Sequence, residues 1–394
     1  MLNKIFGSLI VLIFTFALVS CNDSPSDIGS DFLTQDNLEI LKIDSATDSI
    51  YQESNTFKKV YSLNTAALIY LGKAENITSH MLLKFVFALP DSIKEDIKNG
   101  KINVIQSWVE LIKEYSFGDS LANFDYEVFS IEENWSSSTF TSDSLPFLSI
   151  GNVNLSINPS VNNDSLYSFN LNNSIVADWL LNNADMSMAN NFGIIVSPKS
   201  SSNKIIGFTA YNLTATNDPR LKIIIDKPGV FRDTVTGFIS ADLSAIRGDL
   251  PSVGFENVAV QSGLSAHTKL FFDLSKLPDD IVVNSAKLSL TVDTVLTKTG
   301  KPFANFLRIY LLRDSTNTEI NTNYIYGLSR SGDKFSGDIT NIIRAITNGV
   351  DNQGFLIKSL DDLTGVELFV LKGSNAANIT QRPLLEIVYS RKKK

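Results

Sequence analysis

The chain repeats itself, and this repeat limits its fold more than any other feature. The stretch "HTKLFFDLSKLPDDI" begins at His267, and "HMLLKFVFALPDSI" begins at His80. With one gap, both give a His, a short apolar strand, Leu-Pro-Asp and an apolar residue. The only two histidines of the 394 residues fall on equivalent positions. We therefore expect two copies of one folding unit.

Two further landmarks follow in the same order in both halves. A strand comes after the Leu-Pro-Asp segment, at 102–112 in the first half and at 283–292 in the second. Segments whose apolar residues have helical spacing follow at 171–183 and 339–349. Each half should therefore contain at least one short helix.

A Gly-led strand and a closing strand end each half. The distance from Gly193 to Arg220 is 27 residues, and that from Gly354 to Arg382 is 28. This agreement argues against a chance repeat. The Pro-Gly pair at 228–229 predicts a junction between the halves.

Most of the remaining sequence predicts short strands. The segment 286–293, "AKLSLTVD", alternates apolar and polar residues, as a strand does with one face on a core. Two such sheets bury their apolar faces against each other. We therefore expect an all-β protein with two tandem antiparallel β-sandwich domains, jelly-roll-like, each with one or two short helices. The predicted domains are 39–226 and 231–390.

The N-terminus has the form of a bacterial lipoprotein signal. Lys4 precedes an apolar run that is too short to span a bilayer comfortably, and "LVSC" at 18–21 is a lipobox. The prediction is a signal peptide at 1–20 and a lipid on Cys21, which anchors the protein to the outer membrane, on its periplasmic or outer side. A simple signal peptide with an incidental Cys is the alternative. Because Cys21 is the only cysteine, the mature chain would have no disulfide and no thiol catalyst.

The segment 21–38 is rich in Asp, Ser, Asn and Gly, and it is expected to be a flexible tether. The whole chain carries a net charge of -8. It has no basic stripe with interleaved aromatic residues, so nothing indicates a nucleic-acid partner.

The repeated landmarks resemble the DNRLRE-type β-sandwich module, also described as a family of carbohydrate-binding modules. The second half matches it at Leu277-Pro278, at Gly354 and in the closing "RPLLEIVY" of 382–389, but lacks the tryptophans of the module. The first half has Pro219-Arg220 where the module has Arg-Pro, and matches at 82–85, Leu89-Pro90, Trp135, Trp179 and Gly193. The lipobox with a following "IGSDFL" also resembles uncharacterised Bacteroidetes lipoproteins.

The resemblance implies a secreted or surface protein. Some members of the module family bind polysaccharides such as alginate, and many have no known ligand. The shared motifs are structural, so they support the fold more than an activity. At these positions Trp135 and Trp179 are expected to pack in a core.

No residue constellation predicts catalysis or a cofactor. The spacing of the histidines fits no common zinc site, and both are expected to form hydrogen bonds in a loop or at a strand edge. Paired carboxylates such as Glu132-Glu133 lie in a polar turn, where solvation explains them. The Asp-rich loops at 279–280 and 361–362 leave a structural calcium open. We expect no enzyme, no catalytic residues and no metal ligands.

Trp108 is the one candidate ligand-binding residue. In the repeat alignment it matches Lys287 on the polar face of a strand, while Val109 matches the core-facing Leu288. An outward indole suits a sugar ring, which has apolar C–H faces and polar edges. The alternative is a Trp covered by a loop or by the other domain.

The sequence therefore predicts a surface lipoprotein without catalytic activity that binds polysaccharide or another extracellular ligand through tandem modules. A structural or adhesion protein that binds a protein partner is the second interpretation. A glycan hydrolase with an unrecognised site is the third.

Overall fold

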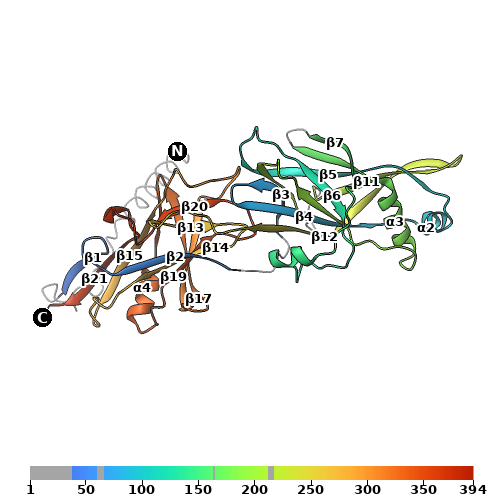
Figure 1. Ribbon diagram of the computed structural model, residues 1–394. Coiled ribbons are helices and arrows are strands. Elements are labelled where there is room, and N and C mark those ends of the chain that lie inside the picture. The colour runs from blue at the N-terminus through green and yellow to red at the C-terminus, as the bar shows by residue number, and fades with distance from the viewer. Residues whose placement is uncertain (1–37, 60–65, 163–164, 212–216, 394) are drawn as a thin grey trace, which may run out of the picture.

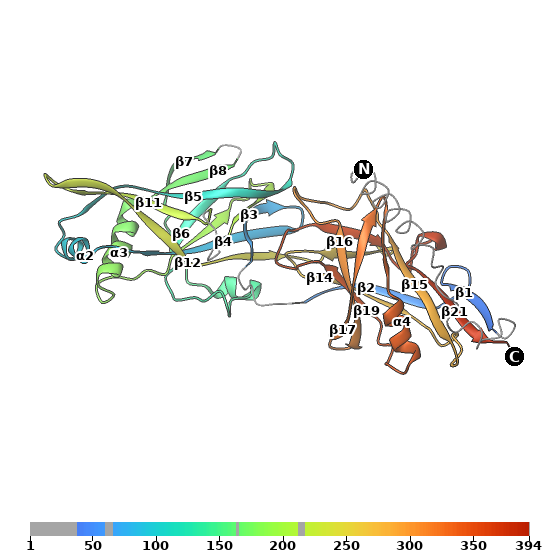
Figure 2. The same cartoon turned by 180° about the vertical axis from the view of Figure 1, so that it is seen from behind.

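The computed structural model describes residues 38–59, 66–162, 165–211 and 217–393. Figure 1 shows two lobes placed end to end, and Figure 2 shows the same arrangement from behind. One lobe is built on a 10-stranded antiparallel sheet and the other on an 11-stranded one. The prediction of an all-β fold with two antiparallel, sandwich-like units is confirmed. The predicted Cys21 and the signal peptide lie outside the described residues.

The first lobe has a sheet that closes on itself, because β10 pairs with both β3 and β5. Its strands are β3 (Leu68–Ala74), β4 (Ile77–Phe87), β5 (Asn103–Gly118), β6 (Tyr126–Ser130), β7 (Ser156–Asn162), β8 (Leu166–Leu171), β9 (Ile194–Pro198), β10 (Lys204–Thr209), β11 (Arg220–Lys227) and β12 (Phe231–Gly248).

The second lobe has a sheet that curls until its two halves face each other across the core. Its strands are β1 (Leu38–Asp44), β2 (Gln52–Lys58), β13 (Asn257–Gln261), β14 (Ala266–Phe272), β15 (Val282–Thr291), β16 (Phe306–Asp314), β17 (Glu319–Ser331), β18 (Lys334–Asp338), β19 (Phe355–Ser359), β20 (Leu368–Lys372) and β21 (Leu384–Lys392).

Short helices complete both lobes. The two predicted helices form as α3 (Asn173–Ala184) and α4 (Thr340–Thr347), each against the equivalent strand of its lobe, β5 or β15. The first lobe also has α2 (Asp91–Lys98) and the 3-10 helix η3 (Ser142–Phe147), and the second has the 3-10 helix η4 (Ile379–Gln381).

The repeat seen in the sequence is a repeat in the structure. In the first lobe Leu83 pairs with Ile194, and in the second Leu270 pairs with Phe355. An Asn side chain supports each pairing in the same way. Asn191 donates a hydrogen bond to the carbonyl of Phe85, and Asn352 donates one to the carbonyl of Phe272. Each of these carbonyls lies five residues after a His, so the two histidines are structurally equivalent.

The first strands of the two repeats are exchanged between the lobes. β1 and β2, at the start of the first repeat, pair with β21 and β14 of the second lobe. β12, at the start of the second repeat, pairs instead with β11 and β4 of the first lobe. β12 and the β1–β2 pair therefore take equivalent places, since each runs along the closing strand first and then along the strand that carries the His.

This exchange corrects the predicted domain ranges 39–226 and 231–390. The first lobe consists of the described residues from 66 to 248, and the second combines 38–58 with 257–393. The Pro-Gly pair is the turn of the β11–β12 hairpin rather than a linker. Pro228 and Gly229 occupy its centre, the N–H of Val230 bonds to the carbonyl of Lys227, and Gly229 has a φ of 73°. Pro followed by a positive-φ Gly is the preference of a type II turn.

The two lobes meet at a joint (Figure 1). The hydroxyl groups of Tyr70 and Tyr115 in the first lobe accept hydrogen bonds from the N–H groups of Gly365 and Val366 in the second, at 2.6 and 3.2 Å. A buried apolar cluster from both lobes surrounds these bonds. Satisfied backbone groups and buried apolar area both stabilise the contact.

Candidate functional site

Trp108 lies on the outer face of the first lobe. It is at the centre of β5, where Ser107, Val109 and Leu111 on either side are buried in the lobe while Trp108 is only partly buried. The period of two in a strand places these three side chains on the opposite face from Trp108. The predicted outward orientation is therefore confirmed.

Polar side chains surround the indole of Trp108. Its Nε1–H donates a hydrogen bond of 2.8 Å to the Glu110 carboxylate. Lys222 of β11 and Asn170 of β8 are its partners on the two neighbouring strands. The ring is thus held at one edge by Glu110 and bordered on both sides by groups that form hydrogen bonds.

A second aromatic residue extends this face. Phe238 of β12 is 41% exposed, and the guanidinium of Arg220 lies 4.7 Å from the centre of its ring. Arg220 is in turn held by the buried Asp218 at 2.5 Å. It also pairs with both Phe238 and Glu110 across the sheet. We call this surface the outer face, and it consists of Trp108, Glu110, Asn170, Arg220, Lys222 and Phe238.

The other part of the same sheet surface is covered. Residues 131–150 cross the outside of β4, β9 and β12, where Trp135, Phe140 and Leu145 pack on Leu82 and other apolar side chains. The Trp135 Nε1–H donates to the carbonyl of Phe192 at 2.8 Å. None of the residues of the outer face belongs to this covering cluster.

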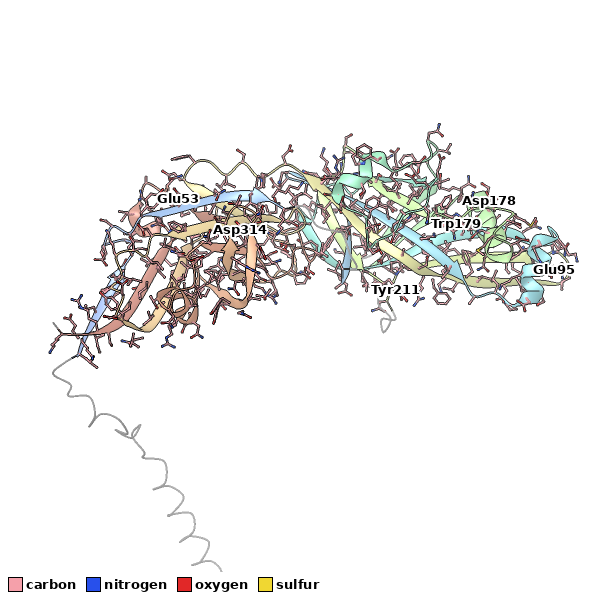
Figure 3. All side chains as sticks on the ribbon, turned by 90° about the horizontal axis from the view of Figure 1, so that it is seen from below. Glu53, Glu95, Asp178, Trp179, Tyr211 and Asp314 are labelled. Atoms are coloured by element: carbon pink, nitrogen blue, oxygen red, sulfur yellow. The ribbon has the colours of Figure 1, made fainter. Side chains whose placement is uncertain are left out.

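Trp179 is buried in the core of the first lobe. It lies on α3 and is 1% exposed, with its ring 6.2 Å from that of Phe85. Figure 3 shows it within the first lobe. The prediction that Trp135 and Trp179 pack in a core is confirmed, and Trp108 is the one tryptophan on the outside.

The histidines lie inside β4 and β14 rather than in loops. His80 Nδ1 is 2.9 Å from the hydroxyl of Ser197, and burial, with the charge of Arg247, lowers the pKa of His80 to about 4. The fully buried His267 has its Nε2 2.9 Å from Asp362. The predicted hydrogen bonds of both are confirmed.

In the group around His267 and Asp362, Ser359 bonds to the carboxylate rather than to the histidine. Ser359 donates to the Asp362 carboxylate at 3.2 Å, and Lys358 binds the second oxygen of Asp362 at 2.7 Å. A nucleophilic Ser would have to bond to the His instead. His267, Asp362 and Lys358 form a hydrogen-bonded network, in which the buried Asp362 carboxylate is paired with the ammonium group of Lys358.

The remaining candidate carboxylates are occupied or solvated. The oxygens of Asp361 accept bonds from the N–H of Leu363 and the hydroxyl of Thr364, so this side chain closes its own turn. Glu132 and Glu133 are both exposed. Within the described ranges, no three or more His, Cys, Asp or Glu side chains form a group that could hold a metal ion.

The structure also reveals residues that the sequence analysis missed. The repeat pattern assigns Phe238 to the second half of the chain. No local sequence signal reveals the strand exchange that brings β12 beside β11, so Phe238 could not be placed near Trp108. Arg220 aligns with Arg382, but the two side chains make different contacts. Arg382 donates to the carbonyl of Ala376 within its own loop, whereas Arg220 lies over Phe238.

Comparison with known proteins adds no assignment: no family model matches the chain, and no curated protein matches it. The similarity to the DNRLRE-type module thus stays a prediction from the motifs. In the part of the chain that the structure describes, none of the helices has the length and apolar character needed to cross a membrane.

Proposed function

We propose that this protein is a lipid-anchored surface protein without catalytic activity, which holds extracellular polysaccharide on its outer face. The observation that carries the proposal is the position of Trp108, a partly exposed indole in the middle of a sheet surface and surrounded by hydrogen-bonding side chains. The anchor is the predicted lipid on Cys21.

The chemistry of the outer face fits a sugar. An indole face offers apolar area and a negative quadrupole to the C–H groups of a sugar ring. Lys222, Asn170 and Glu110 stand around it with donors and acceptors for the hydroxyl groups at the ring edge. Phe238 offers a second ring two strands away, where an adjoining sugar of the same chain can bind.

The test is the replacement Trp108→Ala, measured as retardation in gels that contain a panel of polysaccharides. A sugar that covers about 60 Å² of indole contributes about 1.5 kcal/mol, which is roughly tenfold in affinity. We expect Trp108→Ala to lose most of its retention while its melting temperature changes little, because the residue lies outside the core.

The matched control is Phe255→Ala, which removes an aromatic residue that is 82% exposed, follows β12 in the segment before β13 and is not part of the outer face. It should leave retention unchanged. If the wild-type protein is retained by no polysaccharide, or if both variants behave alike, the proposal fails.

One observation favours the alternative, a protein partner. Val86 and Phe238 are directly opposite each other on β4 and β12, and they are 45% and 41% exposed. A contiguous exposed apolar patch is a mark of a protein-interaction site, and this pair would lie at its centre. For a protein partner, Val86→Ser would weaken binding as much as Trp108→Ala does, whereas Val86→Ser should leave sugar retention nearly unchanged.

A further inference from the structure

A cleft opens at the joint between the two lobes. Its volume is about 740 Å³, in the range of sites that hold small organic ligands. Both lobes line it: Tyr70 and Tyr115 come from the first, and Phe303, Phe306 and Arg308 from the second. None of these residues belongs to the outer face, so the cleft is a separate feature.

The walls of the cleft are aromatic and fixed in place. The ring of Phe306 lies across Gly327, where even a Cβ atom would collide with it. The loop that carries Phe303 is tied to the first lobe by two backbone hydrogen bonds between Lys301 and Ser116, at 3.0 and 2.8 Å. A ligand would therefore meet walls that are largely formed before it binds.

Arg308 is the unsatisfied charge in this cleft. Its guanidinium has no ion-pair or hydrogen-bond partner among the described residues, although Arg308 is partly buried on β16. Its neighbour across the sheet is Lys358 of β19, so two cations lie side by side. Lys358 is bound to Asp362 at 2.7 Å, which leaves the guanidinium of Arg308 as the available donor.

The carboxyl groups that line the cleft do not neutralise Arg308. Asp361 uses both oxygens within its own turn. Glu367 is 5% exposed, and burial raises the pKa of its carboxyl group, with the Tyr115 hydroxyl as a hydrogen-bond partner. An unpaired guanidinium in a partly buried site favours an anionic ligand, and its planar donors match a carboxylate.

We propose that the cleft between the lobes binds a small amphiphilic carboxylate, with the carboxylate on Arg308 and the apolar body between Phe303 and Phe306. The site takes a separate small ligand and does not depend on polysaccharide binding by the outer face. Because both lobes form its walls, the ligand also bridges the joint.

The experiment is calorimetric titration of the full chain with phenylbutyrate and with phenylbutanol, which has the same apolar body and no charge. We expect the acid to bind roughly tenfold or more tightly than the alcohol, since a hydrogen bond to a charged group is involved. Arg308→Gln should reduce the affinity for the acid to that for the alcohol. Phe303→Ala should weaken both ligands.

Arg313→Gln is the matched control, because Arg313 lies on the same strand but is exposed and paired with Glu319. It should bind both ligands as the wild type does. The proposal is overturned if the acid does not bind, if acid and alcohol bind equally, or if Arg308→Gln leaves the affinity for the acid intact.

Discussion

Whether a residue of this protein is exposed or buried follows from the face of the strand on which it lies. Trp108 and Val109 are neighbours in the sequence, but one reaches the outer face and the other the core. Alternation in β5 is enough to predict this from the sequence. It cannot predict Glu110 as the partner of the indole, because that bond depends on side-chain rotamers within the folded sheet.

His80 should make the protein sensitive to acid. Burial lowers its pKa in the folded state to about 4, below the usual value of 6.5, so protonation favours the unfolded chain. The resulting loss in the free energy of unfolding begins as the pH falls below 6.5 and reaches its full size below pH 4. Between pH 7 and pH 4.5 it amounts to about 2–3 kcal/mol of the free energy of unfolding. We expect His80→Gln to lose correspondingly less stability over this range in urea denaturation.

Asp242 provides the control of opposite sign. Burial raises the pKa of its carboxyl group to about 6, so the folded state gains stability as the pH falls through 6. Asp242→Asn removes this gain, so the free energy of unfolding of the variant should fall more than that of the wild type on acidification. Equal pH profiles for the wild type and His80→Gln would contradict the assignment to His80.

At the scale of the elements, the sequence predicted the repeated strands and both α3 and α4. It missed α2, because "LPDSI" and "LPDDI" look alike although only the first begins a helix. After Asp91, the first repeat continues with Ile93 and Ile97 one helical turn apart, and both pack on the core. The second repeat has only a turn there. The difference lies in the residues after the shared motif.

The glycines directly before β9 and β19 occupy the same position in the two repeats, and both need a backbone without a Cβ atom. Gly193 and Gly354 have φ values of 84° and 85°. A Cβ atom would lie 2.2 Å from the Leu83 carbonyl oxygen at Gly193, and 2.8 Å from that of Leu270 at Gly354. Gly193→Ala should therefore cost more than about 2 kcal/mol in the free energy of unfolding, above the roughly 1–2 kcal/mol of the backbone conformation alone.

The comparison variant is Gly229→Ala in the β11–β12 turn. Gly229 also has a positive φ, but a Cβ atom at this position would have no neighbouring atom within 4 Å. In chemical denaturation, Gly229→Ala should lower the free energy of unfolding only by the roughly 1–2 kcal/mol of the backbone conformation. If the two variants are equally destabilised, steric contact with β4 does not contribute.

The whole molecule is defined by the exchange of first strands, which no local pattern reveals. Each repeat carries its own first strand, so the sequence indicates two consecutive domains. The pairing of β1 with β21 joins residues at opposite ends of the chain instead. Figure 3 shows the outcome: Glu53 lies in the second lobe with Asp314, although the sequence places it far closer to Glu95 at the far end of the first.

Fragments should show this exchange directly. Residues 66–250 contain every strand of the first lobe, and we expect them to melt cooperatively on their own. Residues 257–393 lack β1 and β2, which leaves β14 and β21 without one neighbour each. This fragment should be unstable until a peptide of residues 38–59 is added, as followed by circular dichroism.

A peptide with Thr56→Pro is the control, because it cannot keep the pairing of Thr56 with Thr268 in the middle of β2. It should not rescue the fragment. A melting temperature of 257–393 alone that equals that of the full chain would contradict the need for the exchanged strands.

The pairing of β1 with β21 also sets the order in which the chain can fold as it leaves the ribosome or crosses a membrane. Residues 38–58 emerge before the first lobe, but their partners β14 and β21 emerge only after the whole first lobe has appeared. The first lobe can close as soon as β12 is available, whereas the second must wait for nearly the last residue. Two strands with open edges are thus exposed for most of synthesis, when they are open to wrong pairing. We therefore expect the second lobe to complete its fold last and to be the part of the protein most exposed to wrong pairing during maturation.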